Sequence, residues 1–260
     1  MNITVRTITN SVRQTYVTLD IKPPKALTDA YARAEKLTAK AGDLGARPGD
    51  LEQAVAIAVL ADRDPSADPD VQRVTVAHAL MANAGLAGAV SAAGLEGVRD
   101  VCVEHLDDIV GDWGQAFDKA AATLAAAHER IGSVPLTDTT AILARGGDVA
   151  DVWASATRAE QTIDQALNGW VNLMALARVV LDPRHRALKL APMSLQQWQA
   201  APVKLTAWEA VIAGLTLALP TIAEYRSRVA SIQREQAEPV TVIETGRSLV
   251  AGREIRVRVG

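Results

Sequence analysis

The sequence predicts a mainly α protein: a multi-helix bundle with short β-hairpins formed by the N- and C-terminal segments, α+β overall. Two patterns predict it. Apolar residues recur at three- and four-residue steps through most of 25–238, which is typical of helices. They alternate with polar residues in 1–22 and 239–260, which is typical of strands. We therefore expect an N-terminal hairpin or arm (1–22), a helical core domain (25–238) and a C-terminal hairpin or arm (239–260).

Residues 1–22 predict the first hairpin. Its apolar positions are Ile3, Val5, Val17, Leu19 and Ile21. Asn10 and Ser11 lie between the two runs and are typical turn residues. Pro23 and Pro24 should end the second strand, because proline cannot donate a hydrogen bond to a neighbouring strand.

The middle of the chain predicts one helix after another. The apolar spacing indicates helices over 27–41, 51–61, 71–84, 98–131, 149–181 and 207–232. Two capping-box patterns mark helix starts at Ser194 with Gln197 and at Thr206 with Glu209. We expect a break near Gly111 and Gly114, a bend at Gly169 and a kink at Pro220, because these residue types weaken a helix interior.

The C-terminal segment predicts the second hairpin. Its alternating apolar positions are Val240, Val242, Ile255, Val257 and Val259. Gly246 and Gly252 bracket the expected turn. The two terminal hairpins could pair with each other within one chain, forming a four-stranded sheet that implies no partner, or with another chain.

Composition indicates a folded protein. The chain has 260 residues, of which 49% are hydrophobic and 22% charged, with a net charge of −3. These values exclude a disordered, collagen-like or disulfide-rich protein. Cys102 is the only cysteine, which favours a reducing compartment. We find no signal-peptide pattern and no apolar run long enough to span a bilayer, and expect a cytoplasmic location, or a virion if a phage encodes the chain.

The charges are segregated along the chain. Residues 1–25 carry a net charge of +3 and residues 239–260 carry +2, so the segment between them carries −8. Arg outnumbers Lys 20 to 7, and Ala and Gly are abundant, a bias typical of a GC-rich genome such as that of an actinobacterium or its phages. Cationic ends and an anionic middle are complementary surfaces.

The common catalytic and cofactor motifs are absent from the sequence. It contains no phosphate-binding Gly-x-x-x-x-Gly-Lys loop, no dinucleotide-binding Gly-x-Gly-x-x-Gly after a strand, no Gly-x-Ser-x-Gly elbow and no His-Glu-x-x-His. A single cysteine excludes a multi-thiolate zinc site within the chain. We therefore predict no cofactor and no enzymatic activity.

Two acidic segments are weak candidates for metal binding. Residues 62–70 place side-chain oxygens at every second position, as a calcium loop does, but Ala67 and Arg73 stand where that loop needs Gly and Glu. An acidic turn that starts the next helix is the favoured interpretation. Glu104, Asp108 and Asp112 lie four residues apart on one helix face, beside His105 and Asp107. They could hold a hard cation, although a water-facing acidic stripe is the favoured interpretation.

Other conspicuous residues have structural interpretations that we favour. Arg184, His185, Arg186 and Lys189 suit the end of a helix better than a phosphate site. The tryptophans at 153, 170 and 208 fall on apolar faces and are expected in the core. Cys102 falls on the apolar stripe of 98–131 and is expected to be a small buried hydrophobe.

The charge layout predicts a non-enzymatic structural or assembly protein, with a minor capsid or connector protein of an actinobacterial phage as the specific form. Its partners would be proteins or further copies bound through the terminal segments, not a membrane, and direct nucleic-acid binding is not expected. The predicted interaction residues are Arg6, Arg13, Tyr16, Arg247, Arg253, Arg256 and Arg258. The alternative is a helical metal-dependent enzyme or ligand-binding protein with an acidic site around Glu104 and Asp108.

Overall fold

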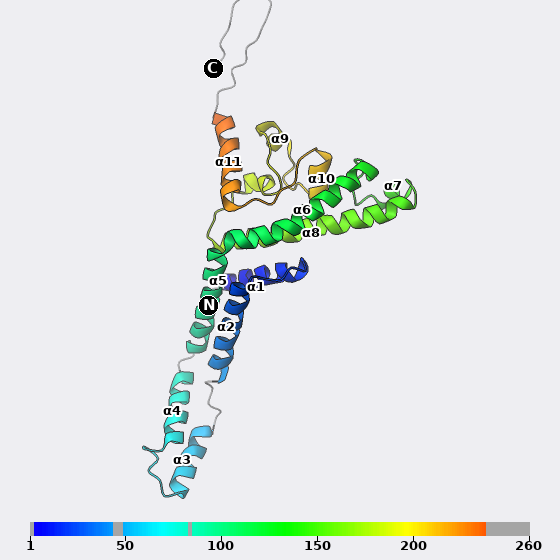
Figure 1. Cartoon of the computed structure of the whole chain (residues 1–260). Coiled ribbons are helices and arrows are strands. Elements are labelled where there is room, and N and C mark those ends of the chain that lie inside the picture. Colours follow the sequence, from blue (N-terminus) through cyan, green and yellow to red (C-terminus); the bar gives the residue numbers. More distant parts are fainter. Residues whose placement is uncertain (1–2, 44–48, 83–84, 238–260) are drawn as a thin grey trace, which may run out of the picture. The chain divides into compact units, whose positions relative to one another are not determined.

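The computed structural model describes residues 3–43, 49–82 and 85–237, and every regular element in these ranges is a helix (Figure 1). In chain order the elements are α1 (Ile3–Thr18), α2 (Lys25–Asp43), α3 (Asp50–Leu60), α4 (Pro69–Ala82), α5 (Leu86–Glu104), α6 (Leu106–Ile131), α7 (Thr139–Leu143), α8 (Asp148–Leu176), the 3₁₀-helix η1 (Pro183–Lys189), α9 (Leu195–Ala200), α10 (Ala207–Ile212) and α11 (Ile222–Ala237). Over these residues the fold is therefore a helical bundle, and they contain no strand.

The predicted N-terminal hairpin is wrong, because α1 occupies its place. The segment carries a helical period as well as the alternation: Thr9, Val12 and Tyr16 lie on one helix face, and all three are fully buried. Two threonines, which favour strands, satisfy their hydroxyls inside the helix. Thr9 Oγ1 donates to Val5 O at 2.9 Å, and Thr15 Oγ1 donates to Ser11 O at 2.9 Å. Asn10 and Ser11 lie within the helix and form no turn.

The predicted C-terminal hairpin, 239–260, lies outside the described residues. In the remainder of the chain, two long predicted helices are divided differently from the expectation. The 98–131 stripe breaks at His105, between α5 and α6, rather than near Gly111. The predicted helix 207–232 is two helices, since Gly214 adopts φ +73° and residues 213–221 separate α10 from α11. Both predicted capping boxes are present, at Ser194 and at Thr206.

The chain divides into two compact units. The first contains Met1–Ala120 with Gln161–Val180, and the second contains Ala121–Glu160 with Leu181–Gly260. The long helices α6 and α8 each contribute residues to both units. None of the described helices is long and apolar enough to cross a membrane.

The first unit is built around aromatic side chains. Tyr16, Trp113, Phe117 and Trp170 have no exposed surface. The rings of Tyr16 and Trp113 lie 5.5 Å apart, and Tyr16 Oη donates to Asp112 Oδ2 at 3.2 Å. Burial, together with the charge of Asp112, raises the pKa of Tyr16. These contacts fix α1 to α6, and they keep the Tyr16 hydroxyl protonated.

Small residues and polar contacts bring the other helices of the first unit together. Helices α2 and α5 lie side by side (Figure 1), and a Cβ at Gly94 of α5 would lie 3.1 Å from Ala34 Cα of α2. Asn172 Nδ2 of α8 donates to Ser11 Oγ of α1 at 2.7 Å. Cys102 is fully buried, and burial raises the pKa of its thiol to about 12. This thiol is therefore a packing group, as expected.

The second unit is organised around Trp208 of α10, which is 2% exposed. Its indole Nε1 donates to Val134 O at 2.8 Å, and its backbone N–H donates to Glu160 Oε1 at 3.2 Å. The ring of His128 packs edge-on against it at 5.8 Å. Trp208 thus connects α10 to α6, to α8 and to the segment after α6.

Candidate interaction surface

Helices α3 and α4 form a short helical hairpin (Figure 1). Among the described elements, α4 is the helix that α3 contacts extensively. Helix α3 begins after Gly49, whose φ of +94° suits glycine, and the chain leaves it at Asp62, whose φ is +55°. The residues between them are mostly Ala, Val, Ile and Leu. A helix that is apolar on every side is normally buried on every side.

The connecting loop is held by two aspartates. Asp64 accepts hydrogen bonds from the backbone N–H and the hydroxyl of Ser66, both at 2.8 Å, and these bonds lower the pKa of Asp64. Asp68 accepts from the backbone N–H of Asp70 at 2.9 Å, at the start of α4. Its other oxygen lies 2.6 Å from Arg63 Nη1. The loop is thus an acidic turn that starts the next helix, which is the interpretation that the sequence favoured over a calcium loop.

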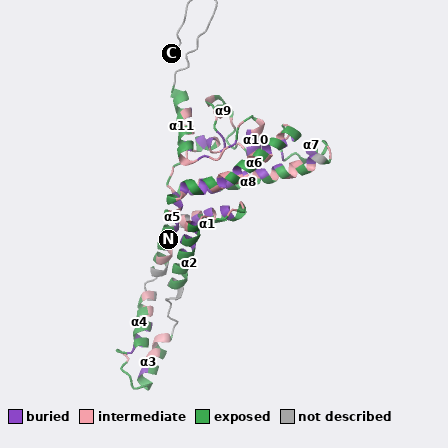
Figure 2. Ribbon diagram, viewed as in Figure 1, coloured by how far each residue is buried: buried purple, intermediate pink, exposed green. Residues whose placement is uncertain are grey.

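The hairpin leaves large apolar side chains exposed. Ile57 is 50% exposed, Val59 59%, Leu60 87% and Val76 of α4 57%. Within α3 only Ala58 is buried. Figure 2 shows both helices almost entirely in the colours of exposed and intermediate residues. Ile57 and Val59, two residues apart, lie on opposite sides of α3, so the exposed apolar side chains spread around the hairpin. Single exposed apolar residues are ordinary, but four on one two-helix element make the hairpin our candidate interaction surface. We call Ile57, Val59, Leu60 and Val76 the hairpin patch.

Acidic groups accompany the hairpin patch. Residues 49–82 contain six acidic and two basic residues, a net charge of −4. Asp62, Asp64 and Asp70 are exposed, and Asp62 follows Leu60 by two residues. The charge of Arg63 is opposed by the buried Asp68. The hairpin therefore offers an apolar and anionic surface.

The structure places the predicted N-terminal interaction residues on α1. Arg6 is exposed. The Arg13 guanidinium lies 2.6 Å from Glu35 and over the ring of Tyr31, 5.3 Å from the ring centroid. Tyr16 is fully buried, so in the described structure it packs α1 rather than presenting a docking group. The remaining predicted interaction residues, Arg247, Arg253, Arg256 and Arg258, lie outside the described residues.

The acidic face considered for metal binding is divided among local contacts. Asp112 accepts the hydrogen bond of Tyr16, and Asp108 Oδ2 lies 3.2 Å from His105 Nδ1. Glu104 and Asp108 are exposed. In the part of the chain that the structure describes, no group of three or more His, Cys, Asp and Glu side chains is arranged to hold a metal ion. The geometry therefore gives the metal-dependent alternative no support.

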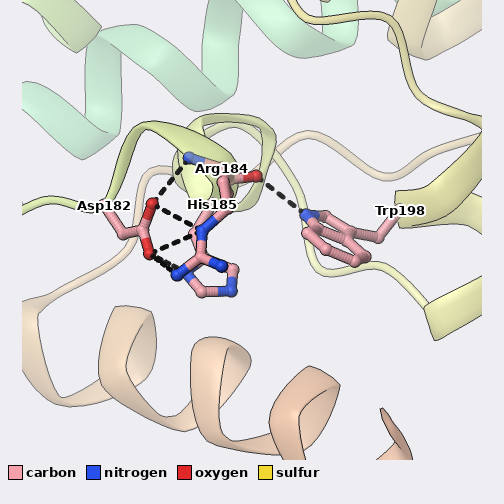
Figure 3. Close-up of polar contacts among 4 residues, drawn as sticks. All are labelled: Asp182, Arg184, His185 and Trp198. Atoms are coloured by element: carbon pink, nitrogen blue, oxygen red, sulfur yellow. Dashed lines mark hydrogen bonds and ion pairs between the residues drawn. The ribbon is translucent and has the colours of Figure 1, made fainter.

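A second polar cluster lies in the second unit, at η1 (Figure 3). Asp182 accepts from the backbone N–H of Arg184 at 2.9 Å and from its guanidinium Nη2 at 2.6 Å. His185 is 5% exposed and lies 3.8 Å from Asp182 and stacked on Trp198, 5.6 Å between ring centroids. Trp198 Nε1 donates to Arg184 O at 3.1 Å. The cluster starts η1 and connects it to α9. Because Arg184 is paired with Asp182, Arg184 is not a ready phosphate ligand.

A surface pocket of about 440 Å³ lies beside this cluster's partner helix, α9. It is lined by Gln196, Gln197, Ala200, Ala201, Pro202, Leu205, Glu209, Ala213 and Leu215. Glu209 is its only charged lining residue, and its carboxylate accepts from the backbone N–H of Thr206 at 2.9 Å to close a capping box. The pocket is thus lined mainly by apolar side chains, and its one carboxylate is engaged in the capping box.

The Asp182 cluster predicts a pH-dependent stability. The hydrogen bonds from Arg184 hold the pKa of Asp182 at about 2, below its ordinary value. A carboxylate with a lowered folded-state pKa stabilises the fold above its ordinary pKa and loses that contribution as the pH falls toward 2. We expect Asp182→Asn to lower the unfolding midpoint at pH 7, and the gap from wild type to shrink between pH 4 and pH 2. Thermal unfolding followed by circular dichroism checks this, and a gap that is constant over that range would contradict it.

No protein-family model, no curated protein and no solved structure matches this chain. Over the described ranges, the class that the fold defines is a helical bundle with an exposed apolar hairpin. The hairpin patch was missed by the sequence reasoning, although the unbroken apolar run 54–61 was the available signal.

Proposed function

We propose that the chain is a non-enzymatic, self-assembling structural protein that associates through the hairpin patch. The observation that carries the proposal is the exposure of Ile57, Val59, Leu60 and Val76 on a two-helix element. Removing apolar surface from water stabilises an interface by about 25 cal/mol per Å². The hairpin exposes these apolar side chains to water in the single chain. It is therefore stabilised when a partner covers them.

The remainder of the described chain favours binding over catalysis. Two of its buried titratable groups have structural partners: Tyr16 donates to Asp112, and His185 packs on Trp198. The thiol of Cys102 is buried, with its pKa raised. The surface pocket beside α9 contains one carboxylate, which caps a helix. In the described part of the chain, the exposed apolar side chains of the hairpin have no comparable structural role.

Light scattering of the purified full chain tests the proposal. We expect a mass above the 27.5 kDa monomer that rises with concentration, and a return to 27.5 kDa in the variant Val59→Asp/Leu60→Asp. The matched control is Val180→Asp/Val203→Asp, because these valines are 92% and 86% exposed and lie outside the hairpin. It should assemble like wild type. A wild-type chain that is monomeric at all concentrations, or two variants that behave alike, would refute the proposal.

The composition supports a narrower form, in which the assembly is a phage particle and the chain a minor capsid or connector protein. The support is the GC-rich residue bias together with an assembly role. Peptide mass spectrometry of purified particles tests this form. The phage form of the proposal requires that the coding region lie among capsid, portal or tail genes. An isolated gene on a host chromosome would contradict this form.

A further inference from the structure

The hairpin patch needs a partner whose charge suits it. Residues 49–82 carry a net charge of −4, so two hairpins packed on each other would bring like charges together. Residues 239–260 of the same chain carry four Arg and two Glu, a net charge of +2, together with nine apolar residues. Resting on the proposed function, we infer that segment 239–260 of a second copy docks on the α3–α4 hairpin.

Segment 239–260 and the α3–α4 hairpin are complementary in residue type. In the segment, Arg256 and Arg258 alternate with apolar residues, so cationic and apolar groups are close together along the chain. On the hairpin, Leu60 is followed within four residues by the exposed Asp62 and Asp64. Arginine suits this role because its guanidinium binds carboxylates through two parallel hydrogen bonds, while its stem covers apolar surface.

Among the residues that the structure describes, few local cations compete for these carboxylates. Arg63 is 2.6 Å from the buried Asp68, and its charge is used there. Arg73 reaches Asp70 at 3.5 Å, with both side chains about 70% exposed. An exposed pair of this kind is weak. Asp62, Asp64 and Asp70 are thus open to arginines from outside the hairpin, and the contact should weaken as salt is added.

Each chain carries one hairpin and one segment, so the contact is heterologous. A heterologous contact repeats from copy to copy and either closes into a ring of two or more copies or continues as an open filament. The expected assembly is therefore a series of masses that increases with concentration, or one ring of defined size.

A charge-swap experiment with two full-chain variants tests the inference. The segment variant is Arg253→Glu/Arg256→Glu/Arg258→Glu, which changes the charge of 239–260 from +2 to −4. The hairpin variant is Glu52→Lys/Asp62→Asn/Asp70→Lys, which changes the charge of 49–82 from −4 to +1. Asn is used at Asp62 because its φ of +55° suits Asn. We expect each variant alone to be a monomer, and an equimolar mixture to regain the wild-type mass in light scattering.

The control is Lys22→Glu/Lys36→Glu/Lys40→Glu, which reverses three exposed cations elsewhere. It should assemble like wild type, and circular dichroism should show the same helix content in all variants. If the segment variant assembles normally while Val59→Asp/Leu60→Asp is monomeric, this inference fails and the proposed function stands, with two hairpins as the contact. Assembly that increases in the segment variant would show docking within one chain, which also overturns the inference.

Discussion

Replacing Trp208 with alanine is expected to lower the free energy of unfolding by about 3–5 kcal/mol, the range for large buried aromatic side chains. Trp208 is 2% exposed, and its ring packs against His128 at 5.8 Å. The substitution removes this ring and its hydrogen bond to Val134 O. Urea denaturation followed by circular dichroism measures the change, and the loss should fall on the transition of the second unit.

Trp208→Phe separates packing from hydrogen bonding. Phenylalanine keeps an aromatic ring but leaves Val134 O without its indole donor. Val134 is half-buried, and losing a hydrogen bond of this kind costs about 0.5–1.5 kcal/mol. We therefore expect an effect between wild type and Trp208→Ala. An alanine variant that is as stable as wild type would show that Trp208 does not organise the second unit.

The helical core could be predicted from the sequence because its signal is local. The stripe Val98, Cys102, Leu106, Ile109, Trp113 and Phe117 is buried as predicted. The capping boxes at Ser194 and Thr206 are also present, since each needs only the residues of one turn. A sequence whose apolar residues keep a helical period over several turns does not fit the two-residue period of a strand.

The N-terminal segment could not be assigned in this way, because it fits two periods. Val5 and Thr7 suit a strand alternation, whereas Val12, Thr15 and Tyr16 suit a helix face. Contacts distant in sequence decide between them. Tyr16 meets Asp112 and Trp113, almost a hundred residues away. Tertiary packing overrides a weak local preference, and no pattern within residues 1–22 contains that information.

The candidate site was predictable in part. The segregation of charge could be read directly from the sequence, and the acidic turn at 62–70 starts a helix as predicted. The exposure of Leu60 and Val76 could not be read from it, because an apolar run such as 54–61 is usually buried. Exposure depends on which elements cover a helix, and that is a property of the whole fold.

Gly169 allows close helix packing rather than bending its own helix. The sequence indicated a bend there, but α8 continues through it from Asp148 to Leu176. A Cβ at Gly169 would lie 2.6 Å from both Cγ2 and Oγ1 of Thr15 in α1. Gly169 therefore allows α1 to approach α8. We expect Gly169→Ala to destabilise the fold by about 1–3 kcal/mol, the usual effect of overpacking, measured by urea denaturation.

Gly111 is the matched control for this substitution. It lies inside α6, and a Cβ there would meet nothing within 4 Å. Alanine at Gly111 should therefore stabilise the protein by up to about 1 kcal/mol, because alanine favours the helix. The clash also predicts coupling: Thr15→Ala removes the two atoms at 2.6 Å and should recover part of the loss in the double variant. Equal effects at Gly169 and Gly111 would mean that α1 does not pack closely on α8.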